Sequence, residues 1–141
     1  SSAASDVYKR QNFNRGKIME TYIIYALALT LLQLWIIPMA LNFKNLSWMM
    51  SSRDQDLDTS SNLYLQRVNK STANLYESLP AFLALALLSL VLGVDTSSAA
   101  CVWLIARVGH LIFYVAGIGL LRTASWLISL GALVCMACAL I

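Results

Sequence analysis

Polar side chains recur at helical spacing along two segments that are otherwise apolar. Three or four residues separate the members of the first set, which are Arg67, Lys70, Asn74 and Glu77. The second set has the same spacing and comprises Arg107, His110 and Tyr114, with Arg122 two further turns along. Because a helix has about 3.6 residues per turn, each set lies on one helix face. Cations, a carboxylate and a hydroxyl group gathered in this way predict a polar binding site.

The composition indicates that these helices lie in a membrane. Hydrophobic residues make up 59% of the chain and charged residues 12%, whereas charged residues make up about 25% of an average soluble domain. The mean hydropathy is +0.67. Charged groups in hydrocarbon cost several kcal/mol each unless they pair or line a wet cavity, so the two polar stripes are expected to be functional.

Apolar stretches of spanning length predict a single all-α membrane domain over residues 1–141, folded as a four-helix bundle. The expected helices cover about residues 18–43, 60–93, 97–121 and 124–141, and a polar loop covers residues 44–59. This assignment places Arg122 at the end of the third helix. Small residues on the last two helices favour close packing between helices and subunits.

A short turn at residues 93–96 predicts that the second and third helices form an antiparallel hairpin. Measured from that turn, Arg107 is about 12 Å along its helix and Glu77 about 25 Å along the other. The long side chain of Arg107 can approach Glu77, so we expect a structural ion pair between them. Pro80 leaves the carbonyl of Tyr76 without its helical donor.

Other features of the sequence predict packing and not chemistry. Cys135 and Cys138 lack the second pair of ligands that a metal site needs, so no metal site is expected. Nothing in the motifs indicates a nucleic-acid partner. Arg67 and Lys70 taken alone are also compatible with cations that reach the membrane interface, and His110 with a satisfied core histidine.

The two stripes resemble the signatures of a known family. The segment 67–82, RVNKSTANLYESLPAF, is similar to the second-helix signature of the MAPEG family, the membrane-associated proteins in eicosanoid and glutathione metabolism. The segment 107–123, RVGHLIFYVAGIGLLRT, resembles its third-helix signature and looks closer to the prokaryotic-type branch. The resemblance covers roughly residues 60–141. Lys70 stands where the family usually has Arg, and Ser71-Thr72 replaces a common Ala-His pair.

This resemblance implies a homotrimer that binds glutathione in a cleft between subunits and receives a hydrophobic small-molecule acceptor from the membrane lipids. Carried over by residue, the glutathione ligands would be Arg67, Lys70, Asn74, Glu77, His110, Tyr114 and Arg122. Arg122, Tyr114 and Thr123 would activate the sulfur. The implied function is a glutathione-dependent transferase or peroxidase acting on a hydrophobic electrophile or lipid hydroperoxide. The alternative is a catalytically silent trimer that binds lipid or another membrane protein.

Cations at both ends of the first helix leave the orientation open from charge alone. Lys9, Arg10, Arg15 and Lys17 precede the helix, whereas Lys44, Arg53, Arg67, Lys70 and Arg122 lie at its other end. The family resemblance implies a multi-pass protein, and we expect a bacterial inner membrane with the glutathione cleft facing the cytoplasm.

Overall fold

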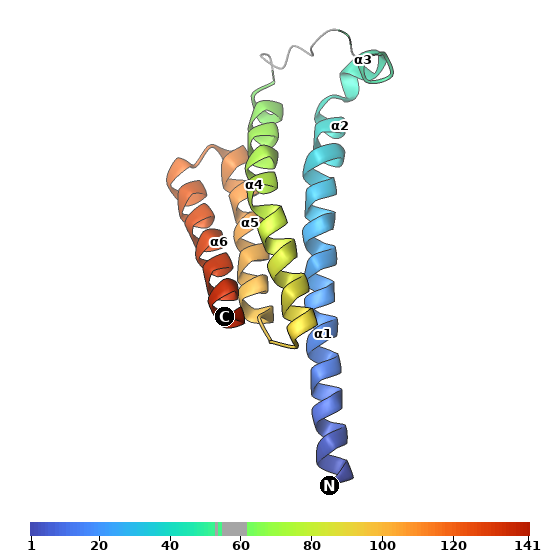
Figure 1. The fold of residues 1–141 in the computed structure, drawn as a ribbon. Coiled ribbons are helices and arrows are strands. Elements are labelled where there is room, and N and C mark those ends of the chain that lie inside the picture. The colour runs from blue at the N-terminus through green and yellow to red at the C-terminus, as the bar shows by residue number, and fades with distance from the viewer. Residues whose placement is uncertain (53, 55–61) are drawn as a thin grey trace.

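Long helices running side by side dominate the computed structural model, which describes residues 1–52, 54 and 62–141 (Figure 1). The described residues contain no strand. The elements in chain order are α1 (Ser2–Leu31), the π-helix η1 (Leu32–Ile36), α2 (Ile37–Leu41), the 3-10 helix η2 (Phe43–Asn45), α3 (Leu46–Met49), α4 (Leu63–Leu92), α5 (Ser97–Ala116) and α6 (Gly119–Leu140). The predicted all-α class is therefore confirmed.

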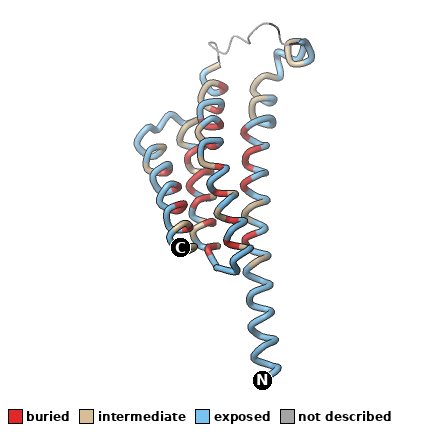
Figure 2. The backbone as a smooth tube through the Cα atoms, viewed as in Figure 1, coloured by how far each residue is buried: buried red, intermediate tan, exposed pale blue. Residues whose placement is uncertain are grey.

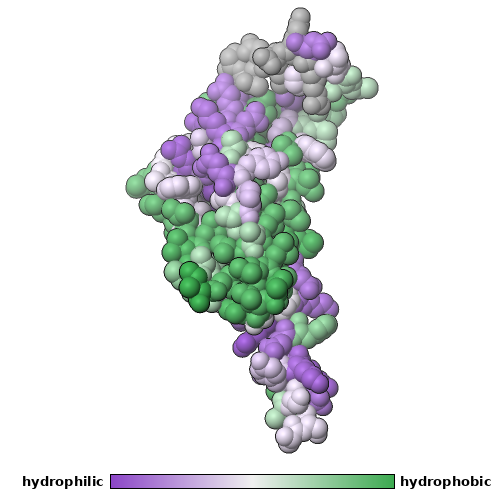
Figure 3. All heavy atoms as spheres, in the orientation of Figure 1, coloured by the Kyte–Doolittle hydropathy of each residue, from purple (hydrophilic) through white to green (hydrophobic). Residues whose placement is uncertain are grey.

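Four of the described helical segments are long and apolar enough to cross a membrane: Ser2–Leu41, Leu63–Leu92, Ser97–Ala116 and Gly119–Leu140. On the face shown in Figure 3, hydrophobic surface covers the lower part of the bundle, with polar surface above it and along the N-terminal stalk. A bundle with this surface is an integral, multi-pass membrane protein.

The first helix is longer than the sequence predicts, because it begins at Ser2 and not near residue 18. Its N-terminal part extends beyond the other helices and is exposed throughout (Figure 2). The apolar stretch predicted only the part of the helix from about residue 18 onward. It gave no signal for the polar helix that precedes it, because that segment has no buried face to impose a pattern.

Pro38 is accommodated by a π-helical turn. Proline has no backbone N–H to bond to the carbonyl four residues earlier. In η1 the N–H of Ile37 bonds to the carbonyl of Leu32, five residues back, and this wider turn inserts one extra residue before the proline. Gln33 in this turn is buried, and its backbone carbonyl accepts a 3.3 Å hydrogen bond from the Thr72 hydroxyl of α4.

Two glycines in the left-handed conformation end α4 and α5. Gly93 has φ 66° and Gly117 has φ 78°, a region that residues with a Cβ rarely adopt. The second turn corrects the predicted helix boundaries: α5 ends at Ala116 instead of residue 121, and α6 begins at Gly119 instead of residue 124. Arg122 therefore lies in the first turn of α6 and not on the third spanning helix.

The segment predicted as a polar loop over residues 44–59 begins as helical turns, because η2 and α3 extend to Met49. The predicted start of the next helix near residue 60 lies outside the described residues. Within them, Asn62 is the N-cap of α4, and its side-chain oxygen accepts a 3.1 Å hydrogen bond from the N–H of Leu65.

Helix α5 lies at the centre of the bundle and packs against α1, α4 and α6. Its Trp103 is fully buried and stacks on Phe82 of α4, with ring centroids 3.9 Å apart and ring planes 8° from parallel. Met19 of α1 and Met136 of α6 belong to the same buried cluster. This core holds α4, α5 and α6 at the distances on which the polar site depends.

Candidate functional site

A cleft of about 430 Å³ lies between α4, α5 and α6. Its walls carry polar side chains from all three helices: Lys70, Ala73, Asn74, Glu77, His110, Tyr114, Arg122, Thr123 and Trp126. The helical periods of α4 and α5 bring the two polar stripes face to face, and the first turn of α6 adds the remaining wall. The structure thus brings together all the predicted ligands except Arg67, and it also gathers the three residues expected to activate sulfur.

Arg122 projects over the aromatic ring of Tyr114. Its guanidinium carbon lies 4.9 Å from the ring centroid, the geometry of a cation–π contact. No hydrogen bond from this guanidinium occurs within the described part of the chain. Arg122 therefore holds a fixed position and keeps its N–H donors available to a ligand.

The hydroxyl groups of Tyr114 and Thr123 differ in whether their protons are available for a hydrogen bond to a ligand. The Thr123 hydroxyl donates a 3.0 Å hydrogen bond to the carbonyl of Gly119 within its own helix, so its proton is engaged. The Tyr114 hydroxyl has no hydrogen-bond partner among the described residues. Tyr114 is therefore the better placed of the two to donate to a ligand atom in the cleft.

The predicted ion pair between Arg107 and Glu77 is not formed, because Asn74 lies between them. Arg107 is buried, with 1% of its surface exposed, and its Nη1 donates a 2.9 Å hydrogen bond to Oδ1 of Asn74. The Nδ2 of Asn74 donates in turn to Oε2 of Glu77 at 3.2 Å. The guanidinium thus fixes the amide, the amide fixes the carboxylate, and Oε1 of Glu77 remains free for a cationic group.

Ser71 and Gln33 orient His110, a role that the sequence does not predict for either of them. The Nδ1 of His110 lies 3.4 Å from the Ser71 hydroxyl, which is also 3.4 Å from Oε1 of Gln33. The other face of the imidazole meets Tyr114 edge to face, with centroids 5.4 Å apart. The only signal in the sequence was a pair of polar residues, Ser71 and Gln33, in helices that are mostly apolar.

Arg67, which the family resemblance offers as a glutathione ligand, does not line the cleft. Its Nη1 donates a 2.9 Å hydrogen bond to the carbonyl of Val115, in the last turn of α5. This cation satisfies a carbonyl that has no helical donor and lies at the negative end of the helix dipole. Arg67 therefore ties α4 to the turn between α5 and α6, the turn that connects Tyr114 to Arg122.

The charges that face the cleft suit an anion that also carries one ammonium group. Lys70 and Arg122 supply positive charge, and Glu77 supplies the single carboxylate. Among the described residues, no group of His, Cys, Asp and Glu side chains could hold a metal ion. The three cysteines are free thiols, and none of them lines the cleft.

Four helices able to span a membrane, with a polar cleft among three of them, define a multi-pass helical membrane protein. The family model that matches this chain is that of the MAPEG family, over residues 21–141. Most of the chain is matched, and the protein belongs to the MAPEG family. A comparison with curated proteins finds no match. Family membership associates the protein with membrane functions in glutathione and eicosanoid metabolism.

Proposed function

We propose that the protein is a glutathione-dependent transferase or peroxidase that acts on a hydrophobic electrophile or a lipid hydroperoxide dissolved in the bilayer. The cleft between α4, α5 and α6 is the observation that supports this proposal. It combines cations, a carboxylate with one free oxygen and an unpaired phenol in a space of about 430 Å³. MAPEG membership supports the choice of glutathione as the ligand.

Glutathione carries two carboxylates, one ammonium group and one thiol. In the proposed complex, Oε1 of Glu77 accepts hydrogen bonds from the ammonium, and Asn74 holds this carboxylate in place. Lys70 binds a carboxylate as a point charge, without the two parallel hydrogen bonds that an arginine makes. His110 forms the opposite wall of the cleft next to Tyr114.

The proposed chemistry begins with loss of the thiol proton to water. A free thiol has a pKa of about 8.5, and only the thiolate is a strong nucleophile. The Arg122 guanidinium and the Tyr114 hydroxyl would stabilise the negative charge on sulfur. Thr123 lines the wall beside Arg122, and its engaged proton favours Tyr114 as the donor.

Two reactions are open to this thiolate. With an electrophile, the sulfur forms a bond to carbon, and either the leaving group departs with its electron pair or the alkene accepts a proton. With a lipid hydroperoxide, the sulfur attacks the terminal oxygen and the O–O bond breaks. The lipid then leaves as an alcohol, and a second glutathione reduces the sulfenic acid to yield glutathione disulfide and water.

A homotrimer is part of the proposal, because one chain leaves the cleft incomplete. The exposed face of α4 carries both charged cleft residues and small residues: Lys70, Ala73, Glu77, Ala81 and Ala84. A charged face at membrane depth is costly against lipid, while small residues allow another helix to approach closely. We place the protein in a bacterial inner membrane with the cleft opening to the cytoplasm, where glutathione is available.

Direct binding of glutathione tests the proposal. Calorimetry and thermal unfolding on the purified protein should both detect glutathione at millimolar concentration, since a ligand above its Kd stabilises the native state. Lys70→Ala should weaken binding, whereas Lys44→Ala is the matched control because Lys44 is exposed outside the cleft. Turnover is measured with chlorodinitrobenzene and with cumene hydroperoxide. Absence of both binding signals would favour a catalytically silent trimer.

A further inference from the structure

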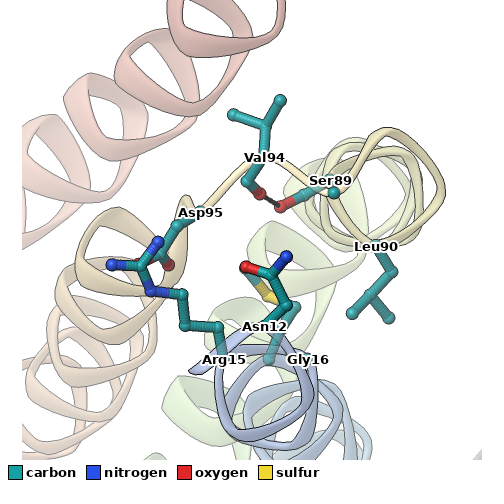
Figure 4. A pocket seen from close by; sticks show the side chains of 9 residues that line it. Asn12, Arg15, Gly16, Ser89, Leu90, Val94 and Asp95 are labelled. Carbon is teal, nitrogen blue, oxygen red and sulfur yellow. Dashed lines mark hydrogen bonds and ion pairs between the residues drawn. The ribbon is translucent and has the colours of Figure 1, made fainter. Parts of the chain in front are cut away.

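A second cavity lies at the opposite end of the bundle from the cleft. It has a volume of about 240 Å³ and is formed by α1 and by the turn between α4 and α5 (Figure 4). Its lining combines polar groups with an apolar wall: Asn12, Arg15, Gly16, Met19, Ser89, Leu90, Gly93, Val94 and Asp95. The proposed glutathione chemistry uses none of these residues.

Hydrogen bonds hold the turn that forms one wall of this cavity. Oδ1 of Asp95 accepts from the backbone N–H of Ser97 at 3.1 Å and from the Ser97 hydroxyl at 2.6 Å. These bonds lower the pKa of the Asp95 carboxyl, so it is ionised at neutral pH. The Ser89 hydroxyl donates to the carbonyl of Val94 and accepts from Thr96. The carboxylate is therefore presented in a fixed position.

The opposite wall carries hydrogen-bond donors that have no partner among the residues that the structure describes. Arg15 approaches Oδ2 of Asp95 through its Nε, at 3.5 Å. Its two Nη nitrogens have no partner among the described residues, and neither does the side-chain amide of Asn12. Both side chains flank the cavity in Figure 4. Guanidinium and amide N–H groups that line one cavity are suited to bind a phosphate group.

We expect the cavity to lie at the boundary between the hydrocarbon and the headgroups, because it lies at one end of the spanning helices. The turn at its wall joins two spanning helices, and the polar stalk of α1 begins here, below the hydrophobic surface (Figure 3). Met19 and Leu90 supply the apolar side of the lining. A ligand held here is therefore in contact with headgroup and acyl regions together.

We propose that this cavity binds the headgroup of an aminophospholipid of the phosphatidylethanolamine type. The phosphate bonds to the Nη groups of Arg15 and to the amide of Asn12, and the ammonium bonds to Oδ2 of Asp95. One positive and one negative protein group thus match one negative and one positive lipid group. The quaternary ammonium of phosphatidylcholine cannot donate a hydrogen bond to Asp95, and the headgroup of phosphatidylglycerol has no cationic group that could pair with this carboxylate.

Competition between lipids tests this assignment. The full chain in mild detergent is given equal amounts of phosphatidylethanolamine, phosphatidylcholine and phosphatidylglycerol with identical acyl chains, and bound lipids are counted by native mass spectrometry. We expect phosphatidylethanolamine to be retained preferentially. Arg15→Gln and Asp95→Asn should each reduce its retention by about tenfold, the loss typical of one charge-assisted hydrogen bond. Arg10→Gln is the matched control, because Arg10 is an exposed arginine of α1 outside the cavity.

Three outcomes would overturn the proposal. If Arg10→Gln reduces retention as much as Arg15→Gln, the attraction is diffuse and involves no site. Preferential retention of phosphatidylglycerol, strengthened by Asp95→Asn, would indicate an anionic lipid. Equal binding of glycerophosphoethanolamine, which has no acyl chains, would identify a soluble phosphate compound as the ligand. Arg15→Lys keeps the charge and provides a second variant, should Arg15→Gln fail to fold.

Discussion

Three arginines near the cleft each meet a different kind of electron-rich partner. Arg107 donates to the side-chain amide of Asn74, Arg67 donates to the backbone carbonyl of Val115, and Arg122 lies over the ring of Tyr114. A guanidinium has five N–H donors, and only the first two arginines use any of them on the described residues. Arg122 is therefore the arginine whose full hydrogen-bonding capacity remains for a ligand.

Replacing Arg122 tests its proposed role at the sulfur. Bound glutathione should show thiolate ultraviolet absorbance that titrates below the pH at which the free peptide titrates. Arg122→Ala should abolish this shift and lower kcat by about a hundredfold, as loss of one group that stabilises a reacting anion does. Affinity should fall only about fivefold, because a partly exposed charge contributes little to binding. Arg122→Lys is the control, since it retains the charge.

A mutant at position 122 that keeps both the lowered thiol pKa and the turnover rate would contradict this role. The activating charge would then come from Lys70 or His110. Loss of the shift in Tyr114→Phe, with Thr123→Val unchanged, would identify Tyr114 as the hydroxyl donor.

Substitutions at Asn74 and at Glu77 should separate an effect on stability from an effect on glutathione binding. Asn74→Ala removes the hydrogen-bond acceptor of the buried Arg107 guanidinium, so the free energy of unfolding should fall by about 2–3 kcal/mol. Glu77→Gln keeps that bond and should change stability by less than about 1 kcal/mol, because the Glu77 side chain is exposed in the single chain. Its glutathione affinity should nevertheless fall, since the ammonium loses its partner.

Thermal unfolding and calorimetry on the same preparations distinguish these two effects. If Glu77→Gln destabilises the protein more than Asn74→Ala does, the Glu77 carboxylate contributes more to stability than the Asn74 amide. The proposal that Asn74 is the main partner of Arg107 would then be wrong.

At the scale of single residues, helical spacing predicted which residues share a helix face but not which atoms each side chain contacts. It correctly placed Asn74, Glu77, His110 and Tyr114 around one space. It could not show that Asn74 lies between Arg107 and Glu77, because both side chains are long enough for a direct contact. The partner of Arg67 is a backbone carbonyl 48 residues away, and such a contact leaves no trace in the sequence pattern.

At the scale of elements, the turn between α5 and α6 determines whether the cleft exists. This turn brings Arg122 close to Tyr114, and Gly117 allows the chain to adopt the turn. A Cβ at this position would lie 2.8 Å from Nη2 of Arg67, so the turn needs glycine both for its conformation and for the space that Arg67 occupies. The apolar run continues to Leu121, so the sequence alone predicts a third helix that extends through this point.

Gly117→Ala and Gly93→Ala form a matched pair that measures the Arg67 contact. Both glycines have positive φ, so each alanine should cost about 1–2 kcal/mol of unfolding free energy. A Cβ at Gly93 meets no atom within 4 Å. Gly117→Ala should cost more, because it also displaces the guanidinium from the carbonyl of Val115. Combining it with Arg67→Met should give less than the sum of the single effects.

Thermal unfolding of the four variants in one detergent provides this comparison. Equal losses for the two glycine variants, with additive effects in the double mutant, would mean that Arg67 does not support the turn. Reduced turnover in Arg67→Met with unchanged glutathione affinity would further indicate that Arg67 acts by positioning Tyr114 and Arg122.

At the scale of the whole molecule, the exposed face of α4 combines small residues with a charged residue. Ala73, Glu77, Ala81 and Ala84 lie along this face, and all are exposed. The composition predicted an integral membrane protein from these helices. The small residues of the last two helices predict close packing there, but the sequence does not identify α4 as a subunit contact, because a face that meets another helix and a face that meets lipid have equally apolar residues.

We therefore expect α4 to pack against a neighbouring copy of the protein, and we expect Ala84→Leu to disrupt that contact. A leucine at this position would hold the two helices apart where small residues allow close approach. Native mass spectrometry in mild detergent should give a trimer for the unmodified protein and mostly monomer for Ala84→Leu, with glutathione affinity lost together with assembly. Ala40→Leu is the control, because Ala40 is also an exposed alanine but lies on α2. A monomer that binds glutathione with unchanged affinity would show that a single chain completes the site, and an Ala84→Leu variant that remains a trimer would show that the subunits meet elsewhere.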